Sequence, residues 1–376
     1  MRIAFVNGFY NPTIGGVEKV VEELATRYAK QGHEVHVFCA DTDKHKRIKK
    51  KFEIIDGVRV HRSRYWFKLS LNTYIAPGII WVLIWNKYDV VHSHVSGHDY
   101  VLWAGLVAFL KGRKHVHTTH CPWTDKFRPL TVRIPLFFTD NFFNYISFFF
   151  CNKVIAITPW EVPTLKKWMS EKKIKVIRNG MDPIFFERFK KGNFKKKLGI
   201  KKKLILFFGR LHPTKAPDQF VAVAKEILKD RNDLEFAIVG PDEGEMEKVK
   251  NLVKDEKRIH IYGAIHGKKN IAEMYQDSEV YVLTSYREGL PLTLFEAMAS
   301  GLPIVSTPCN GIPYELKDGV NGYLVEYGNI EKFKEKILYL VDNSSVKKKI
   351  SGINVLKTKN YTWDQIASET LDIYKE

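Results

Sequence analysis

Short apolar strands alternate regularly with helical stretches along this chain. Between the first two strands, segment 17–32 carries apolar residues at helical spacing and ends at Gly32. Such alternation predicts a parallel sheet, because parallel strands need long crossover connections. The predicted strands of the first half are "IAFVN" (3–7), "EVHVFC" (34–39), "VRVHR" (58–62), "VVHSH" (90–94), "HVHTTH" (115–120) and "KVIAIT" (153–158).

The same alternation starts again in the second half, which predicts two doubly wound α/β domains. A length of 376 residues also exceeds what one hydrophobic core usually serves. We place the boundary near 176–186, giving domains 1–180 and 181–361, and expect a last helix, 362–376, to pack back on the first domain through Trp363. The second series of strands is "LILFFGR" (204–210), "EFAIVG" (235–240), "IHIYG" (259–263), "VYVLTS" (280–285) and "PIVST" (303–307).

The net charge of +18 favours an anionic partner, which nucleic acid, anionic lipid or a phosphorylated substrate would each provide. Much of the charge lies in the lysine-rich runs 43–51 and 189–203, which we interpret as solvated loops or linkers. The chain shows no RRM, KH or zinc-finger pattern, so nucleic acid is not expected as a partner.

The cysteines and the N-terminal residues both favour a cytoplasmic protein. No Cys-x-x-Cys pair is present, and reduced thiols are the simplest interpretation. The stretch "MRIAFVNGFYNPTIGG" reads as a first strand rather than as a secretory signal. The four cysteines are Cys39, Cys121, Cys151 and Cys309.

Two apolar segments raise the question of a membrane. Segment 75–85 is too short to span a bilayer. Segment 134–150 is rich in phenylalanine but is interrupted by polar residues, which predicts a buried or interfacial amphipathic helix. We therefore expect possible peripheral contact with an anionic membrane, on the inner face of the cell membrane, through that helix and the residues before it, Trp123, Lys126, Phe127, Arg128 and Arg133.

Ligands of doubly wound sheets bind outside the carboxyl ends of the strands, so the residues that follow each strand are informative. Gly15 and Gly16 precede the first helix and would let its amides approach an anion, although tight packing explains a Gly-Gly pair equally well. Arg210 and Lys215, in the loop "GRLHPTKAPD", suit a diphosphate; the alternative is that both are ordinary surface cations.

The stretch "YREGLPLTLFEAMASG" (286–301) places two carboxylates around the start of a predicted helix that begins with Pro291 in its first turn. Glu288 is expected in the loop, facing the cleft, and Glu296 about one and a half turns inside the helix. One carboxylate would accept hydrogen bonds from a polyol and the other from a ribose diol. A phosphate would lie between them at the helix amides, with donor-binding residues Leu290, Leu292 and Thr293.

This pattern resembles the signature of the family-four retaining glycosyltransferases, which have the GT-B fold. After the two glutamates come "AMASGLPIVSTPCNGIPYEL" and "DG.NGYLV" (318–325), and the Gly-Gly pair, the "GRL....K" loop and the "NG.D" linker occur in the family's order across nearly the whole chain. The chain departs at "EGLP", where Gly-Phe-Gly is more usual after the first glutamate. The identity of the donor sugar therefore stays open.

The resemblance implies two Rossmann-like domains facing a central cleft, and transfer of a sugar from a UDP- or GDP-linked nucleotide sugar to an unknown acceptor, with no cofactor. It implies that Arg210 and Lys215 bind the diphosphate, Glu288 the hydroxyls of the transferred sugar and Glu296 the ribose. His120 matches the family's active-site histidine, although a packing role stays possible in a region this rich in histidine. Retention by front-face attack needs no enzymic nucleophile, since the leaving phosphate oxygen can take the acceptor's proton.

We expect no metal. "DTD" (41–43) resembles the metal motif of the other glycosyltransferase fold but runs straight into lysines, and His92, His94 and His98 lack a supporting carboxylate or cysteine. Cys121 is expected on the strand face opposite to His120. Two alternatives remain: a nucleotide-sugar 2-epimerase of the same architecture, and a basic protein that binds nucleic acid or membranes without catalysis.

Overall fold

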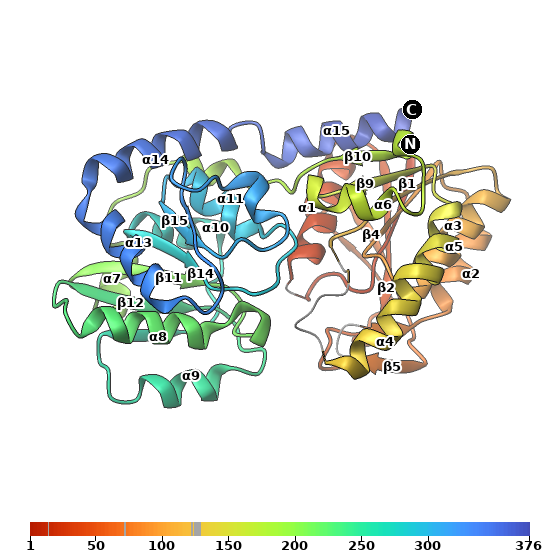
Figure 1. Ribbon diagram of the computed structural model, residues 1–376. Helices are drawn as coiled ribbons and strands as arrows, with labels where there is room; N and C mark the ends of the chain where they lie inside the picture. The colour runs from red at the N-terminus through yellow and green to blue at the C-terminus, as the bar shows by residue number, and fades with distance from the viewer. Residues whose placement is uncertain (14, 71–72, 122, 124–128) are drawn as a thin grey trace. The chain divides into compact units, whose positions relative to one another are not determined.

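The structure is a computed structural model that describes residues 1–13, 15–70, 73–121, 123 and 129–376. The chain divides into two compact units, whose helices and strands are labelled in Figure 1. Unit 1 comprises Met1–Asn179 together with Trp363–Glu376, and unit 2 comprises Gly180–Thr362. Each unit is built around its own mainly parallel sheet.

The sheet of unit 1 has eight strands in the order β10-β9-β8-β7-β1-β2-β4-β3. All neighbours are parallel except β3 and β4, so the edge strand departs from the parallel arrangement that the sequence predicts. A separate antiparallel pair, β5 and β6, lies outside this sheet. The strands are β1 (Arg2–Val6), β2 (Glu34–Ala40), β3 (Phe52–Ile55), β4 (Val58–Ser63), β5 (Phe67–Ser70), β6 (Thr73–Ile75), β7 (Val90–His94), β8 (Lys114–Thr118), β9 (Lys153–Ala156) and β10 (Ile174–Val176).

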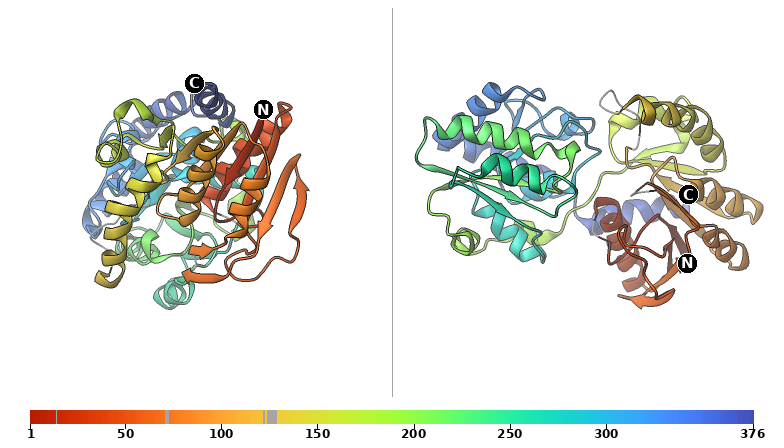
Figure 2. Two further views of the ribbon diagram at one scale, coloured as in Figure 1. Left: turned by 90° about the vertical axis from the view of Figure 1, so that its right-hand side faces the viewer. Right: turned by 90° about the horizontal axis from the view of Figure 1, so that it is seen from below.

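Helices cover both faces of this sheet: α1 and α15 lie on one face, and α2, α3 and α5 on the other (Figures 1 and 2). Helix α15 belongs to unit 1 although it follows unit 2 in the sequence, and its Trp363 is buried as predicted. The helices are α1 (Gly16–Lys30), α2 (Gly78–Trp85), α3 (Asp99–Leu110), α4 (Leu130–Phe138), the π-helix η1 (Thr139–Phe143), α5 (Asn144–Phe149), η2 (Pro159–Glu161), α6 (Val162–Leu165), η3 (Glu171–Lys173) and α15 (Trp363–Lys375).

The sheet of unit 2 has six parallel strands in the order β13-β12-β11-β14-β15-β16. Its strands are β11 (Lys203–Phe208), β12 (Leu234–Val239), β13 (Ile259–Tyr262), β14 (Val280–Leu283), β15 (Ile304–Ser306) and β16 (Tyr323–Leu324). Its helices are η4 (Pro183–Phe186), α7 (Asn193–Leu198), η5 (Pro213–Lys215), α8 (Pro217–Leu228), α9 (Met246–Val253), α10 (Lys268–Gln276), α11 (Leu292–Ala299), α12 (Ile312–Glu315), α13 (Ile330–Asp342) and α14 (Ser344–Thr358).

The core of unit 2 explains why its strands read as continuous apolar runs in the sequence. Helices α8 and α13 pack against each other over the sheet, and all of β12 and the four central residues of β11 are buried. The rings of Phe207, Phe220 and Phe236 meet there, with centroid distances of 5.6 and 5.8 Å. The lysine-rich run 189–203, interpreted from sequence as loop or linker, contains the short helix α7.

The aromatic segment 134–150 is divided by the π-helix η1 and is buried only in part. Helices α4 and η1 contain no buried residue, whereas α5 buries Asn144, Ser147 and Phe148. In addition, no helix within the described ranges of the chain combines the length and apolar character needed to cross a bilayer. Lys126, Phe127 and Arg128, which the sequence also assigns to membrane contact, lie outside the described residues.

Candidate functional site

Two neighbouring strands of unit 2, β11 and β14, end at the same edge of the sheet, and each is followed by a loop that carries predicted site residues. The first loop contains Arg210 and ends in the 3-10 turn η5, whose last residue is Lys215. The second runs from β14 to α11 and contains Glu288. Because β11 and β14 are parallel and adjacent, their loops are brought together.

Lys215 and Glu288 form an ion pair across these loops. The Lys215 Nζ lies 2.5 Å from Glu288 Oε1, and the Ser285 hydroxyl donates to the same oxygen at 2.6 Å. Their side chains are only 15% and 7% exposed, so neither charge is well solvated without the other. The sequence assigns them separate roles, and it gives no sign that they are paired.

Backbone contacts fix the two loops to each other. The Thr284 hydroxyl donates to the carbonyls of Lys215, at 3.2 Å, and Ala216, at 2.9 Å. The amide of Tyr286 donates to the carbonyl of Thr214 at 3.1 Å. Ala216 has a φ of 47°, a left-handed conformation that costs a non-glycine residue about 1–2 kcal/mol. The loop therefore has a defined shape before any ligand binds.

Arg210 is paired with Glu243, which accepts a hydrogen bond from the Arg210 guanidinium. Glu243 lies in the loop after β12, the next strand of the sheet. The Arg210 side chain is 37% exposed, so it keeps donors available to solvent or to a ligand.

Helix α11 begins at Leu292, the first residue of the predicted helix "LTLFEAMAS", but Pro291 is the extended N-cap residue and not part of the first turn. The correction follows from the ψ of 133° at Pro291, which is outside the helical range. Leu292 and Thr293 therefore supply first-turn amides that have no partner within the helix. Leu290, just before the cap, is buried, which favours a packing role for its side chain.

Glu296 is the fifth residue of α11, and its carboxylate accepts a hydrogen bond from a tyrosine of α10. The Tyr275 hydroxyl donates to Glu296 Oε2 at 3.1 Å, and the Tyr281 hydroxyl donates to Thr293 Oγ1 at 2.9 Å. Burial, together with the nearby Glu296 carboxylate, raises the pKa of Tyr275 well above its ordinary value, so the hydroxyl stays a donor.

In unit 1, Gly15 and Gly16 lie where β1 leads into α1. Gly15 is the N-cap residue in extended backbone, and Gly16 is the first residue of the helix. Among the described residues, a Cβ on Gly16 would meet nothing within 4 Å, whereas one on Gly15 would come 2.1 Å from Glu18 Oε2. The space beside Gly16 is therefore open, and tight packing against other residues does not explain that glycine.

His120 does not lie on a strand, which corrects the sequence prediction. Strand β8 ends at Thr118, and His120 and Cys121 follow with left-handed φ angles of 63° and 54°. Cys121 is therefore not placed opposite to His120 by strand alternation, as the sequence predicts. Glu161, buried and unpredicted, holds this turn by accepting from the amides of Cys121 and Ile157 at 2.9 and 2.8 Å.

Histidines next to His120 form a buried hydrogen-bonded cluster across β7 and β8. His94 Nδ1 lies 3.0 Å from His120 Nε2, and His92 lies 2.5 Å from the Tyr374 hydroxyl of α15 and 2.8 Å from Thr118 Oγ1. Burial lowers the pKa of His92 and His94 well below the ordinary value and that of His120 to about 3. These rings are therefore neutral at neutral pH.

The residues weighed as metal ligands are used in other ways. Asp41 accepts from the amide of Tyr65 and faces Arg47, and Asp43 accepts from the amides of His45 and Lys46 within a turn. Over the described ranges, no three His, Cys, Asp or Glu side chains are grouped so that they could hold a metal ion.

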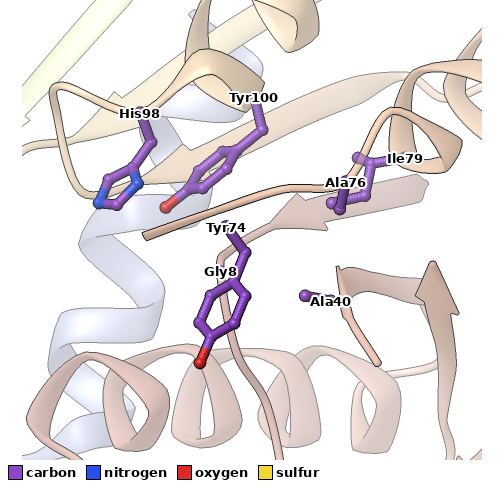
Figure 3. A pocket seen from close by; sticks show the side chains of 7 residues that line it. All are labelled: Gly8, Ala40, Tyr74, Ala76, Ile79, His98 and Tyr100. Atoms are coloured by element: carbon purple, nitrogen blue, oxygen red, sulfur yellow. The ribbon is translucent and has the colours of Figure 1, made fainter. Parts of the chain in front are cut away.

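Neither of the two hollows considered inside the units contains the predicted residues. A cavity of about 10 Å³ in unit 1, lined by Gly8, Ala40, Tyr74, His98 and Tyr100 among others, has room for about one water molecule (Figure 3). A hollow of about 470 Å³ in unit 2 includes Glu279 and Pro303, which precede β14 and β15, so it lies at the amino ends of those strands.

Comparison with known proteins places both units in one group of families. Residues 14–185 match the family described as "Glycosyltransferase Family 4", and residues 190–353 match "Glycosyl transferases group 1". A glycosyltransferase of Methanocaldococcus jannaschii is 26% identical over 100% of this chain and 98% of its own length. The UDP-Gal:alpha-D-GlcNAc-diphosphoundecaprenol alpha-1,3-galactosyltransferase of Escherichia coli is 29% identical over 72% of this chain and 73% of its own.

Solved structures confirm the predicted fold class. The Anabaena protein HepE, crystallised in complex with UDP, superposes with a TM-score of 0.78 at 18% identity and covers 100% of both chains. A lipopolysaccharide glycosyltransferase, WaaG, superposes with a TM-score of 0.73 at 16% identity, covering 99% of both chains. At these identities the likeness shows the fold, which is GT-B with two Rossmann-like sheets.

Proposed function

Because the chain belongs to the family-four, group 1 glycosyltransferases, whose members transfer sugars, we propose that its donor is a nucleotide-diphosphate sugar, UDP- or GDP-linked. The observation that carries the proposal is the Lys215–Glu288 pair at the carboxyl edge of the unit 2 sheet, next to Arg210 and the start of α11. Relatives named for UDP-Gal and for UDP complexes support a nucleotide sugar. The family assignment does not favour the 2-epimerase alternative.

We assign the diphosphate to the two cations and to the helix start. Lys215 would exchange part of its contact with Glu288 for a phosphate oxygen, and Arg210 would do the same with Glu243. The amides of Leu292 and Thr293 would add donors at the positive end of α11. Cations around the leaving diphosphate stabilise the charge that develops as the sugar departs.

Glu288 and Glu296 are then binding groups rather than an acid and a nucleophile. Glu288 is already engaged by Lys215 and Ser285, which suits an acceptor of hydrogen bonds from sugar hydroxyls. Glu296, held by Tyr275, would bind the ribose diol. We propose retention by front-face attack, in which the acceptor hydroxyl bonds to the anomeric carbon, the carbon–phosphate oxygen bond breaks, and that oxygen takes the proton.

The donor assignment is tested with purified wild-type protein and a panel of nucleotide sugars. We expect one donor to raise the unfolding temperature, since ligand at about 100 times its Kd stabilises by about 2.7 kcal/mol. Arg210→Ala and Glu288→Gln should each lower donor turnover about a hundredfold or more. Arg231→Ala is the matched control, because Arg231 binds Asp233 and Asp342 at the other end of β12. Full activity in both site variants would sink the assignment.

Two further experiments test the epimerase alternative and the need for a metal. Incubation with UDP-GlcNAc alone should give no epimer, and the appearance of an epimer would establish the epimerase activity. We propose that transfer needs no metal, since Asp41 accepts from the amide of Tyr65 and Asp43 from the amide of Lys46. Rates should therefore be unchanged after EDTA treatment, and a loss restored by Mg²⁺ or Mn²⁺ would contradict this.

For the acceptor we propose a lipid-linked molecule, met at an anionic membrane surface on the cytoplasmic side. Helices α2, α3 and α5 contact one another in sequence and leave large apolar side chains exposed; Trp85 is 78% and Leu110 73% exposed. Lys87, Arg113 and Arg133 are exposed beside or within this surface, so its charge suits anionic lipid rather than a second copy of a chain of net charge +18. We call the set the apolar face: Trp81, Trp85, Phe109, Leu110, Leu130, Ile134, Phe137, Phe138, Phe142, Tyr145, Ile146 and Phe149.

Membrane contact is tested by sedimentation with liposomes at low salt. We expect binding to vesicles that contain anionic lipid and a clear loss in the variant Trp85→Ser/Phe149→Ser. Tyr339→Ser in unit 2, which removes an exposed aromatic ring outside the apolar face, is the control. Failure of the wild-type protein to sediment, or a dimer that hides the face in solution, would remove the proposal.

A further inference from the structure

In two histidine pairs of unit 1, Nδ1 of one ring faces Nε2 of the other. The pairs differ in what the Nε2 of the first ring meets. In the first, His94 Nδ1 lies 3.0 Å from His120 Nε2. In the second, His36 Nδ1 lies 2.9 Å from His61 Nε2. Burial lowers the pKa of His94 well below the ordinary value, that of His120 to about 3 and that of His61 to about 4, and it also lowers the pKa of His36. Each pair therefore consists of two neutral rings at neutral pH.

A neutral imidazole carries one N–H donor and one bare acceptor nitrogen, so one ring of each pair must donate and the other accept. The direction of this hydrogen bond is set by the group that the Nε2 of His94 or of His36 meets. If that nitrogen must be protonated, the Nδ1 of the same ring is bare and can only accept. If it need not be protonated, the Nδ1 can carry the hydrogen and donate.

In the second pair the outer partner is a carboxylate. His36 Nε2 lies 3.1 Å from Glu34 Oε1, and an ionised carboxylate only accepts. His36 therefore carries its hydrogen on Nε2, and its Nδ1 accepts from His61 Nε2. In this pair, therefore, His61 is the donor and His36 is the acceptor.

In the first pair the outer nitrogen has no partner. His94 Nε2 is buried without a hydrogen-bond partner among the described residues, and the His94 ring packs between His92, at 4.3 Å, and Phe5, at 5.8 Å. A buried N–H left unpaired is rarer than a bare acceptor. The hydrogen of His94 therefore belongs on Nδ1, and His94 donates to His120 Nε2, opposite to the direction of the second pair.

We propose that His94 is a positioning residue that holds His120 in the tautomer with its hydrogen on Nδ1. The inference rests on the proposed function together with the resemblance, which implies that His120 is the active-site histidine that helps to orient the donor sugar. Nδ1–H has no partner among the described residues, and His120 is partly exposed, so this group is available to a ligand. As a fixed donor, His120 bonds an oxygen of the sugar but does not accept the proton of the acceptor hydroxyl.

The direct test is long-range ¹H–¹⁵N NMR of the full chain labelled in the histidine rings, near neutral pH. The signals of His120 and His61 are assigned with the variants His120→Asn and His61→Asn. We expect the hydrogen on Nδ1 in His120 and on Nε2 in His61. Finding His120 protonated on Nε2, or both rings in the same tautomer, would overturn the proposal whatever the enzyme activity.

Variants of His94 connect the tautomer to the reaction. His94→Phe removes the donor, so His120 should lose its single tautomer, and kcat should fall about tenfold with little change in KM for the nucleotide sugar, a loss within the range seen for partners that fix a histidine ligand. His94→Asn places an amide N–H near the former Nδ1 and should restore both the tautomer and most of kcat. His36→Phe, in the second pair, should leave transfer unchanged.

These outcomes separate two kinds of failure. If His120 has the expected tautomer but His94→Phe transfers sugar at the wild-type rate, the positioning role of His94 is wrong. If His120→Ala also transfers at that rate, the proposed role of His120 is what fails. If His94→Phe does not fold, the tautomers of the wild-type chain still decide the first claim, and His94→Asn decides the second.

Discussion

In unit 2 the predicted site residues are ions that meet across loops, whereas in unit 1 they are glycines and a histidine beside a buried polar cluster. Lys215 and Glu288 neutralise each other in unit 2. In unit 1 the cluster around His120 consists of neutral rings, and the one buried carboxylate that shapes its turn, Glu161, binds backbone amides. Around the predicted site residues, therefore, unit 2 is ordered by pairing of opposite charges and unit 1 by hydrogen bonds between neutral groups and to backbone amides.

The largest expected effect is acid unfolding of unit 1 before unit 2. Ten of the 13 histidines belong to unit 1, and burial holds the pKa of His98 and His115 at about 4 and that of His92, His94 and His117 well below the ordinary 6.5. Below pH 6.5 the unfolded chain binds protons that the folded unit does not, so stability falls as the pH drops toward 4. Each such histidine costs about 1.4 kcal/mol per pH unit.

Tryptophan fluorescence checks this prediction, because all eight tryptophans belong to unit 1. Unit 2 is followed in the same samples by amide hydrogen exchange of residues 203–239. Coincident loss of both signals on acidification would contradict the difference between the units.

The second prediction concerns the ion pair of unit 2. Lys215→Met should destabilise that unit by about 1–3 kcal/mol, since it leaves the buried Glu288 carboxylate without its charged partner. The double variant Lys215→Met/Glu288→Leu should recover most of the stability and none of the donor turnover. Denaturant unfolding and turnover assays separate the two effects. A double variant no more stable than the single one would show that the pair does not behave as a unit.

The third prediction concerns the buried carboxylate of unit 1, Glu161. Glu161→Ala should destabilise the unit by about 1–3 kcal/mol, because it leaves the buried amides of Cys121 and Ile157 without an acceptor. Glu161→Gln keeps one acceptor oxygen and should lose less. Urea unfolding followed by fluorescence measures both, and equal losses in the two variants would contradict the prediction, because the acceptor oxygen that glutamine keeps would then contribute nothing.

The smallest expected effect is that of Gly16→Ala. Its Cβ meets open space and the position is helical, so stability should rise by about 0.5–1 kcal/mol. A drop in donor or acceptor use in this well-folded variant would indicate that a ligand approaches the Gly16 backbone. Unchanged kinetics would leave Gly16 with a conformational role only.

The sequence predicts the strands well because their apolar runs are local signals: β7, for example, has the bounds read from "VVHSH". Features that depend on distant partners could not be predicted. The Lys215–Glu288 pair joins residues 73 positions apart, and Glu161 reaches the turn at Cys121 across 40 positions. The alternating pattern of "HVHTTH" predicts a strand that includes His120, and the residue types give no sign of the left-handed backbone that follows β8.

The place of α15 in unit 1 has a consequence for biosynthesis. Unit 2 is one continuous segment, Gly180–Thr362, and all of it emerges from the ribosome before α15 does. Unit 1 needs α15, which covers α1 and brings the Tyr374 hydroxyl to His92. The unit synthesised first must therefore be completed last, so nascent residues 1–179 wait with the surface that α15 covers, on α1 and around His92, still exposed while the second unit folds behind them.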